Sequence, residues 1–314
     1  MGVMKMLHKS VLLSESISNL NIKNGGVYVD ATLGFGGHSS EILKKNKKGM
    51  LICFDQDNEA INYSKEYLSK FGNNFTIIKS NFVNMKSELN KLGITKVDGI
   101  LFDLGVSSVQ LDEAERGFSF HKDAKLDMRM NQEQDLSAYE VVNTYSFKDL
   151  VRILTKYGEE KYASSIARNI IKYREKKNIE TTMELSEIVN SSVPMKVRRE
   201  KNPSRKTFQA IRIEVNNELE VLSSALEQAI DLLDINGRIC VITFHSLEDR
   251  IVKQTFKKYS EVDKMFKDLP EIPEEYKPIL KLIGKSITPG NNELEENNRA
   301  RSSRLRVAEK IRIK

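Results

Sequence analysis

The stretch Asp30-Ala-Thr-Leu-Gly34-Phe-Gly36-Gly37-His38-Ser39, followed by Asp55, decides the fold of this chain. Apolar residues at 27–29 predict a strand, the glycines predict a tight turn, and residues 50–55 predict a second strand ending in Asp55. Glycines allow the backbone to approach a ligand closely, because they carry no Cβ. A carboxylate that follows the second strand is placed to accept both hydroxyls of an adenosine ribose. The pattern therefore predicts a nucleoside-cofactor site at the carboxyl ends of parallel strands.

Two cofactors compete for this turn. Nicotinamide dinucleotides favour Gly-x-Gly-x-x-Gly, and Ser39 stands here where the third glycine is required. S-adenosylmethionine has no pyrophosphate and does not demand that spacing, and the acidic Asp30 suits its cationic methionine end. The turn therefore favours S-adenosylmethionine. The remaining alternative is an ordinary strand-to-helix turn that binds nothing.

Strands and helices alternate as far as residue 103, which is typical of a parallel sheet covered on both faces. Residues 105–135 then read as a polar loop, and the apolar spacing over 136–192 predicts several helices. We expect a long helix over about 206–233, a strand over 238–244, a helix over 247–258, a loop-like segment over 260–298 and a last strand over 305–313. The predicted fold class is α/β: a doubly wound, Rossmann-like sheet with a helical insertion domain. The predicted domains are 1–108 with 216–314 for the cofactor, and 109–215 for substrate recognition.

Composition limits the classes of protein that the chain can belong to. It has 314 residues, and it contains no apolar run near the roughly 20 residues of a membrane span. Lys5, His8 and Lys9 interrupt the apolar start, which excludes a signal-peptide pattern. Cys53 and Cys240 lie in apolar runs, so we expect reduced, buried thiols and a cytoplasmic location. The four histidines are scattered, so no metal site is expected.

The net charge of +6 is concentrated in two segments. Residues 195–206 carry a net +5 and residues 299–314 a net +6, so the rest of the chain is about −5. Basic segments on a neutral-to-acidic body fit a polyanionic partner, most simply nucleic acid. We expect Arg205, Lys206, Arg301 and Arg304 to contact RNA phosphates, although solvated charged segments would look the same.

Asp103 is the main candidate for chemistry, since it ends the strand next to the cofactor strand. The exocyclic amine of cytosine or adenine is a poor nucleophile, and a carboxylate that accepts its N–H hydrogen bonds assists methylation. Asp103 could equally hold its own loop. Phe118 and Phe120 could stack on an extruded base or anchor their loop. Ser246 reads as a helix N-cap, which leaves His245 facing the predicted site as a second catalytic candidate.

Nine segments together resemble the bacterial ribosomal RNA small-subunit (cytosine-N4)-methyltransferase family, RsmH/MraW. They cover nearly the whole chain in order. Two departures stand out: Asn202-Pro-Ser-Arg-Lys206 replaces the usual His-Pro-Ala-Thr-Arg, and Asn297-Asn298 replaces Asn-Pro. The matching segments are His8-x-x-Val-Leu-Leu13, Asp30–Ser39, Asp103–Asp112, Arg116-Gly-Phe-Ser-Phe120, Leu126-Asp-Met-Arg-Met130, Tyr157-Gly-Glu-Glu160, Thr207-Phe-Gln-Ala210, Phe244–Arg250 and Arg299-Ala-Arg-Ser-Ser303.

The resemblance implies an S-adenosylmethionine-dependent enzyme that methylates N4 of a cytidine in the decoding region of small-subunit (16S) ribosomal RNA. Its partner would be that RNA or the ribosomal subunit, and the enzyme is a monomer or a homodimer. A DNA amine methyltransferase is disfavoured because Leu104-Gly105 follows Asp103 in place of Pro-Pro. An RNA-binding module with an inactive cofactor fold is the non-enzymatic alternative. The cofactor residues implied are Gly36, Gly37 and His38 for the methionine part, Asp55 for the ribose, Phe82 for the adenine, and Asp103 and Gln110 to complete the pocket.

Overall fold

The structure is a computed structural model, and it describes residues 10–200, 202–262, 264–266 and 270–313. The chain divides into two compact units, one formed by the residues up to Gly105 together with Leu219 onward, the other by Val106–Glu218. These divisions fall within three residues of the domain boundaries that the sequence predicts. Each unit has its own set of buried hydrophobic residues.

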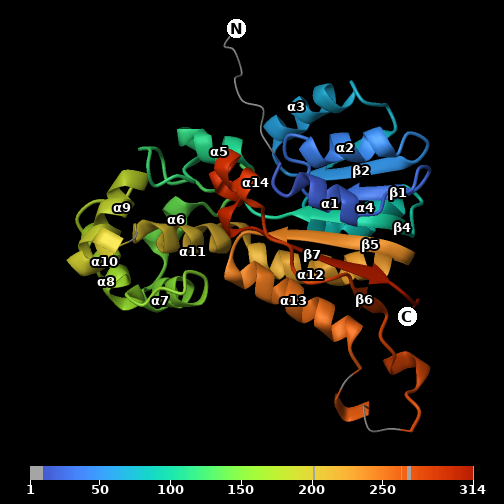
Figure 1. Ribbon diagram of the computed structural model, residues 1–314. Helices are drawn as coiled ribbons and strands as arrows, with labels where there is room; N and C mark the ends of the chain where they lie inside the picture. Colours follow the sequence, from blue (N-terminus) through green and yellow to red (C-terminus); the bar gives the residue numbers. More distant parts are fainter. Residues whose placement is uncertain (1–9, 201, 263, 267–269, 314) are drawn as a thin grey trace. The chain divides into compact units, whose positions relative to one another are not determined.

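The first unit is built on a seven-stranded sheet with the order β3-β2-β1-β4-β5-β7-β6 (Figure 1). The first five strands in this order are parallel, whereas β7 runs antiparallel to both β5 and β6. This arrangement confirms the predicted doubly wound α/β fold of the class I methyltransferase type. The strands are β1 (Val27–Asp30), β2 (Met50–Asp55), β3 (Phe75–Lys79), β4 (Val97–Asp103), β5 (Leu233–Thr243), β6 (Leu280–Leu282) and β7 (Arg304–Lys310).

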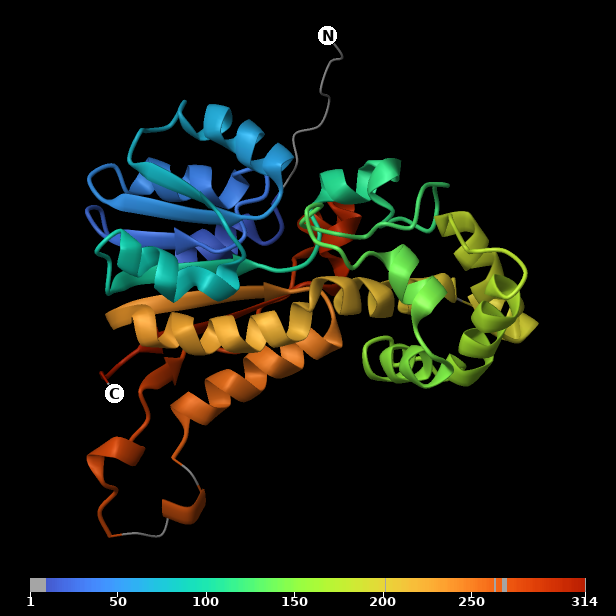
Figure 2. The same ribbon diagram turned by 180° about the vertical axis from the view of Figure 1, so that it is seen from behind.

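Helices cover both faces of this sheet, as Figures 1 and 2 show from opposite sides. Along β2, Leu51 and Cys53 belong to one core cluster and Ile52 and Phe54 to the other, because side chains alternate between the faces of a strand. All four are fully buried, which explains the continuous apolar run in the sequence. The first face carries α1 (Leu13–Asn19), α2 (Gly37–Lys45) and α3 (Asn58–Leu68), and the second carries α4 (Met85–Lys91), α12 (Glu218–Leu232) and α13 (Ser246–Ser260).

Cys53 and Cys240 are both buried free thiols, as the sequence predicts. Among the residues that the structure describes, no helix combines the length and the apolar character needed to cross a membrane.

The segment after α13 is more ordered than the loop-like prediction for residues 260–298. It contains β6 and α14 (Asn291–Glu296), together with the short turns η3 (Lys264–Phe266), η4 (Glu274–Tyr276) and η5 (Asn298–Ser302). Elements of three to six residues are too short to show a period in the sequence. Strand β6 forms by pairing with β7, which lies more than twenty residues further along the chain. A local sequence pattern does not reveal such a pairing.

The second unit is helical. Helix α7 packs against α8 and α11 and buries Leu150, Ile153 and Leu154 between them. Within residues 106–200 and 202–218, extended pairing is limited to one bridge between Lys125 and Thr181. The helices are α5 (Ser108–Asp112), η2 (Ala114–Arg116), α6 (Ala138–Thr144), α7 (Phe147–Lys156), α8 (Ala163–Arg174), α9 (Thr182–Ser191), α10 (Met195–Glu200) and α11 (Ser204–Asn216).

The single long helix predicted over about 206–233 is wrong, because two helices meet at Asn217. This residue has φ 47° and ψ 37°, in the left-handed region, so α11 ends there and α12 begins at Glu218. Asparagine tolerates this backbone conformation better than other residues with a Cβ. The helical period continues across the break, and this is why the sequence alone does not reveal it.

We expect Asn217→Val to destabilise the protein by about 1–2 kcal/mol, since a β-branched residue strains a left-handed backbone. Asn217→Gly should leave the stability within about 0.5 kcal/mol of the parent, because glycine adopts positive φ freely. Urea unfolding followed by circular dichroism measures both variants. Equal stability of the valine and glycine variants would show that the junction does not require the left-handed residue.

Candidate functional site

The glycine turn joins β1 to α2 at the carboxyl edge of the sheet. Gly36 has φ +77°, its N–H donates to the Leu33 carbonyl at 2.9 Å, and it occupies the N-cap of α2. Since glycine has no side chain, the first N–H groups of α2 receive no side-chain cap, and they form a favourable site for a carboxylate. Ser64 of α3 supports the turn by donating its hydroxyl to the Gly34 carbonyl at 2.8 Å.

Asp55, at the end of β2, braces this turn. Its Oδ2 accepts a hydrogen bond from the Gly34 N–H at 2.8 Å, and its Oδ1 accepts from the N–H groups of Gln56 and Asp57 at 2.8 and 2.9 Å. A carboxylate has about four acceptor positions, so roughly one remains for a ribose hydroxyl. Burial raises the pKa of Asp55 to about 6, against the lowering effect of the three backbone donors. The bracing role was not visible in the sequence.

Asp30 lies beneath the turn rather than in front of it. It is 1% exposed, and it accepts hydrogen bonds from the Ser39 hydroxyl at 2.6 Å and the Thr32 N–H at 3.1 Å. Thr32 in turn accepts from the Asp103 N–H at 2.6 Å, which links β1 to the end of β4. Burial raises the pKa of Asp30 to about 6. The buried Asp30 therefore braces the residues around the turn through Ser39 and Thr32.

Asp103 and His38 face each other, with 3.6 Å between His38 Nδ1 and Asp103 Oδ2. Burial lowers the pKa of His38 to about 4, so the ring is neutral at pH 7. Burial, and then the nearby charges of Asp30 and Glu248, raise the pKa of Asp103 well above its usual range. Among the described residues, neither Asp103 Oδ1 nor His38 Nε2 has a hydrogen-bond partner, although both atoms are buried. Such atoms are uncommon in native proteins and indicate a missing ligand or water.

Phe82 follows β3 at the same edge of the sheet, in the short helix η1 (Phe82–Asn84). Its ring packs edge-to-face on Phe102 of β4, with 5.5 Å between the ring centroids, and it is partly buried against the core. The ring is fixed in place and keeps part of its surface available to a flat ligand.

His245 is the N-cap of α13, so the prediction that Ser246 caps this helix is wrong. The His245 ring accepts from the Glu248 N–H, and the buried Glu248 carboxylate accepts from the His245 N–H at 3.2 Å and the Phe244 N–H at 2.8 Å. This reciprocal capping gives both residues a structural role at the start of α13, and the catalytic role predicted for His245 stays a prediction. The neighbouring Asp249 forms a two-pronged ion pair with Arg306 of β7, at 2.7 and 3.0 Å.

Gln110 belongs to the second unit, where it is 8% exposed. Its side-chain oxygen accepts from the Ser107 N–H at 3.0 Å, and the Ser107 hydroxyl accepts from the Gln110 N–H at 3.1 Å. The amide therefore stabilises the turn at the start of α5. Its predicted contribution to the cofactor pocket stays a prediction.

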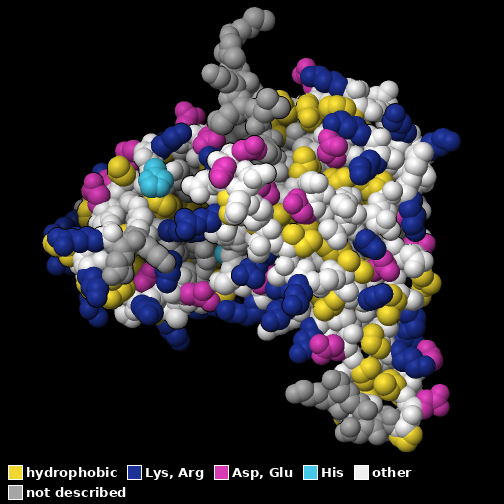
Figure 3. All heavy atoms as spheres, in the orientation of Figure 1, with side chains coloured by type: hydrophobic (Ala, Val, Ile, Leu, Met, Phe, Trp, Pro, Cys, Tyr) yellow, Lys and Arg dark blue, Asp and Glu magenta, His cyan; other side chains and the backbone are white. Residues whose placement is uncertain are grey.

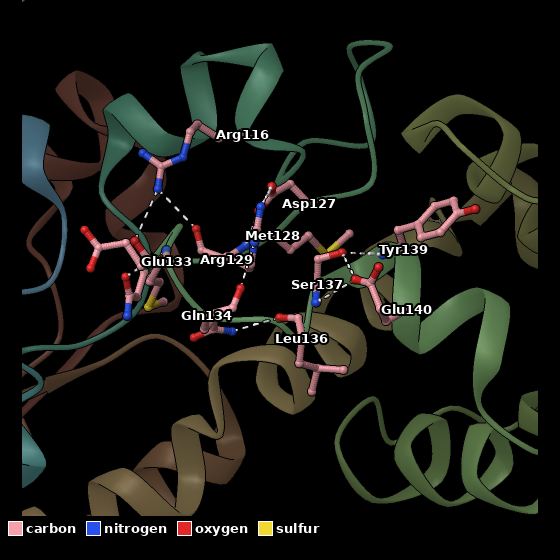
Figure 4. A network of polar contacts seen from close by, with 12 residues as sticks. Arg116, Asp127, Met128, Arg129, Glu133, Gln134, Leu136, Ser137, Tyr139 and Glu140 are labelled. Carbon is pink, nitrogen blue, oxygen red and sulfur yellow. Dashed lines mark hydrogen bonds and ion pairs between the residues drawn. The ribbon is translucent and has the colours of Figure 1, made fainter.

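Two motifs of the predicted loop hold each other in the second unit (Figure 4). The Arg116 guanidinium donates to the carbonyls of Arg129 and Met130, and Arg129 forms a two-pronged pair with Asp127 and donates to the Gln134 carbonyl at 2.7 Å. Phe118 is buried, and Phe120 packs edge-to-face on Phe208 at 5.5 Å. Of the two alternatives that the sequence leaves open, these contacts favour the loop anchor over base stacking.

Several side chains of the two basic segments bind other parts of the protein, so fewer of them can contact RNA than the sequence suggests. In β7 and beyond, Arg306 pairs with Asp249, Arg312 pairs with Glu274, and the buried Lys310 donates to the Ile230 carbonyl at 2.6 Å. Arg301 and Arg304 are exposed, and no ion pair is found for them among the described residues. In the second unit, Lys206 donates to the Glu159 carbonyl at 2.7 Å.

A nucleoside ligand with an amino-acid end fits this edge of the sheet. The N-terminus of α2 suits its carboxylate, the carboxylates of Asp30, Asp103 and Glu248 suit positive charge, and Asp55 and Phe82 suit an adenosine. The fold and the site thus define a methyltransferase of the S-adenosylmethionine-dependent class. The profile of the MraW methylase family matches residues 5–311, and the chain belongs to this family.

The chain is 55% identical over 307 residues to the Ribosomal RNA small subunit methyltransferase H of Exiguobacterium sibiricum, covering 97% of this chain and 98% of that protein. Among solved structures, an rRNA methylase from Streptococcus thermophilus is 11% identical with a TM-score of 0.45, covering 98% of this chain and 100% of that one. A Streptococcus mutans protein crystallised in complex with SAH is 12% identical with a TM-score of 0.44, over 98% and 100% of the two chains.

We expect Asp55→Ala to weaken S-adenosylmethionine binding by about 2–3 kcal/mol, as for the loss of charge-assisted hydrogen bonds. Lowering the pH from 7.5 to 5 should weaken binding to the parent protein, because protonation near pH 6 removes an acceptor charge. The same protonation favours the free folded protein, since the folded pKa lies above the unfolded value. Acid therefore acts on binding and on folding in opposite directions.

Isothermal titration calorimetry over this pH range tests the assignment, with Asp55→Asn expected to flatten the pH dependence. Asp231→Asn is the matched control, because Asp231 is an exposed carboxylate paired with Lys86 on the surface of the same unit. An Asp55→Ala affinity equal to that of the parent would remove Asp55 from the binding site.

Proposed function

We propose that this methyltransferase transfers a methyl group from S-adenosylmethionine to N4 of a cytidine in the decoding region of small-subunit (16S) ribosomal RNA. The observation that carries the proposal is the buried, unpartnered Asp103 oxygen beside the glycine turn, which offers an acceptor to an N–H donor. The name of the 55% identical relative supports the same substrate class. A DNA amine substrate is disfavoured because Leu104 and Gly105 stand in place of the usual Pro-Pro after Asp103.

We infer the following division of roles among the cofactor residues. S-adenosylmethionine, when bound, supplies the methyl group on a positively charged sulfur. Orphaned buried atoms at Asp103 and His38 and the uncapped start of α2 fit this group. Gly36, Gly37 and His38 would hold its methionine part, Asp55 its ribose and Phe82 its adenine, while Asp103 and Gln110 complete the pocket.

Asp103 would assist the methylation of cytosine N4, which is a weak nucleophile. The cytosine N4 lone pair is delocalised into the ring, and a carboxylate that accepts an N–H hydrogen bond makes the nitrogen more nucleophilic. The amine must lose a proton once it carries the new methyl group. Because the pKa of Asp103 is raised by burial and by Asp30, its carboxylate holds that proton better than an ordinary aspartate does. His245 supports this edge as a positioning residue through Glu248.

The RNA contacts are proposed for exposed basic residues in both units. Arg301 and Arg304 at the start of β7 would contact phosphates in the first unit, and Arg205 and Lys206 in the second, where the helical insertion over 109–215 serves substrate recognition. We propose a cytoplasmic location, where the enzyme would act on the RNA or on the ribosomal subunit. A homodimer is compatible with these assignments, and sedimentation decides between monomer and dimer.

We expect Asp103→Asn to fold normally and to methylate about 10²-fold more slowly in single-turnover experiments at saturating cofactor and RNA. The amide oxygen still accepts a hydrogen bond, but it can neither offset positive charge on N4 nor take its proton. The parent rate should rise with pH as Asp103 ionises, and the variant should lose this dependence. Near-parent rates at saturation would instead leave Asp103 as a cofactor-binding residue, and mass analysis of the RNA identifies the methylated base.

We expect the double change Arg301→Ala with Arg304→Ala to weaken RNA binding and to reduce the slope of log affinity against log salt by roughly one unit per lost contact. Fluorescence anisotropy over a salt series measures this slope, and cofactor affinity should hold. Lys86→Ala with Lys91→Ala removes the same charge from α4, where both lysines are paired with acids. A slope as steep as the parent's in the arginine variant would show that Arg301 and Arg304 are merely solvated.

A further inference from the structure

The first described residues of the chain form a strap against the glycine turn of the first unit. The strap consists of residues 10–12 and leads directly into α1. A Cβ on residue 37 would lie 1.9 Å from the Ser10 hydroxyl oxygen, so the Ser10 side chain fills the space beside Gly37. Val11 and Leu12 are buried in the core cluster that also contains residues of α2. The strap therefore packs against the start of α2.

The strap also contacts His38, in the first turn of α2. Burial lowers the pKa of His38 to about 4, and a hydrogen bond between its ring and the Val11 backbone acts against that lowering. Nε2 of the same ring is buried and has no hydrogen-bond partner among the described residues. One edge of the ring is therefore fixed by the strap, while the other edge presents an unsatisfied nitrogen to a ligand.

The strap has an unfavourable backbone conformation at Leu12. This residue has φ 50° and ψ 36°, in the left-handed region that residues with a Cβ rarely adopt. Its N–H donates to Glu293 Oε1 at 2.7 Å, a bond between residues 281 positions apart in the chain. Residues in such conformations persist only where the surrounding structure holds them, and they are often found in ligand clamps. The Glu293 carboxylate is therefore one of the contacts that keep the strap in place.

Glu293 belongs to α14, which is drawn red in Figure 1, whereas α1 is drawn blue. The next residue, Leu294, packs against the core cluster that contains Leu12 and anchors α14 there. Figure 3 shows acidic side chains at the surface over this helix. Glu295 and Glu296 are exposed, whereas Glu293 is half-buried. The contact between Glu293 and Leu12 is thus made by a glutamate that differs from its neighbours in being partly enclosed.

We propose that the strap closes the methionine end of the cofactor site, and that Glu293 is the positioning residue that keeps it closed. The Ser10 hydroxyl lies beside Gly37, at the uncapped start of α2, and would donate a hydrogen bond to the cofactor carboxylate there. The Val11 backbone would fix the orientation of the His38 ring. The proposal rests on the proposed placement of the methionine part at this turn, and it does not depend on the RNA substrate.

The test compares two ligands bound to the full chain without RNA. S-adenosylhomocysteine carries the amino-acid end, and 5′-methylthioadenosine lacks it. Glu293→Ala should weaken S-adenosylhomocysteine binding about 3- to 10-fold, as for the loss of one net hydrogen bond, and should leave 5′-methylthioadenosine binding unchanged. Glu293→Gln keeps an oxygen that accepts from the Leu12 N–H, so it should bind both ligands as the parent does. Isothermal titration calorimetry measures both affinities, with the weaker ligand followed by displacement.

Glu295→Ala is the matched control, because it removes the same charge from an exposed position of the same helix. Ser10→Ala is a second variant that leaves α14 intact, and it should show the same selective loss of S-adenosylhomocysteine binding. Equal S-adenosylhomocysteine binding by Glu293→Ala and the parent would overturn the proposal. An equal loss for the two ligands would overturn it as well, since it would indicate a general structural effect.

Two further results separate this proposal from the assignments on which the function rests. His38→Ala removes a residue of the proposed methionine site itself, so unchanged S-adenosylhomocysteine binding in this variant would overturn the placement of the methionine end and the role of the strap with it. A parent protein that fails to methylate the decoding-region RNA would count against the proposed substrate alone, because the affinities of both ligands are measured without RNA.

Discussion

The hydrogen bond from the Gly34 N–H to the Asp55 carboxylate, at 2.8 Å, is the contact on which the site depends. It fixes the turn after β1 to the end of β2, and the turn then fixes where α2 begins. The uncapped helix start, the ring of Phe35 and the side chain of His38 all take their positions from this turn. Asp55 is also the residue predicted to bind the ribose. The same carboxylate would therefore hold the turn in place and contact the cofactor. One residue therefore has two roles, and a loss of cofactor binding on mutation of Asp55 reports on the turn and on the ribose contact together.

The elements that the sequence predicts well are those with a strong local cause. The strand at 50–55 matches the predicted bounds because it is buried on both faces of the sheet. The glycine turn is readable because only glycine adopts its backbone conformation at Gly36 without strain. By contrast, the break at Asn217 interrupts a helical period that continues on either side, and β6 exists only through its pairing with β7.

The roles of the site residues are harder to predict from the sequence than the fold is. They depend on burial and on hydrogen-bond partners, which only the tertiary structure determines. In the sequence, Asp30 suits the cationic end of the cofactor, but only the structure shows that it is buried and accepts a hydrogen bond from Ser39. His245 is a catalytic candidate in the sequence, and its role as the cap of α13 appears only in the structure. Near the end of the chain, Arg306 is paired with Asp249 and the buried Lys310 donates to a backbone carbonyl. Arg301 and Arg304, by contrast, are exposed. A count of charges in a segment therefore overstates the surface that is open to a polyanion.

The order of the strands also sets the order in which a nascent chain can fold. Strands β1 to β4 are complete at Asp103, but β4 pairs with β5, which begins at Leu233 after the whole helical unit. While the ribosome makes the intervening residues, β4 is an open sheet edge, the kind of surface that invites wrong pairing. The helical unit is built from local contacts and can fold during that interval. The length of the helical unit therefore also sets how long β4 waits for its partner. The sheet is completed only after β5 and β7 have left the ribosome.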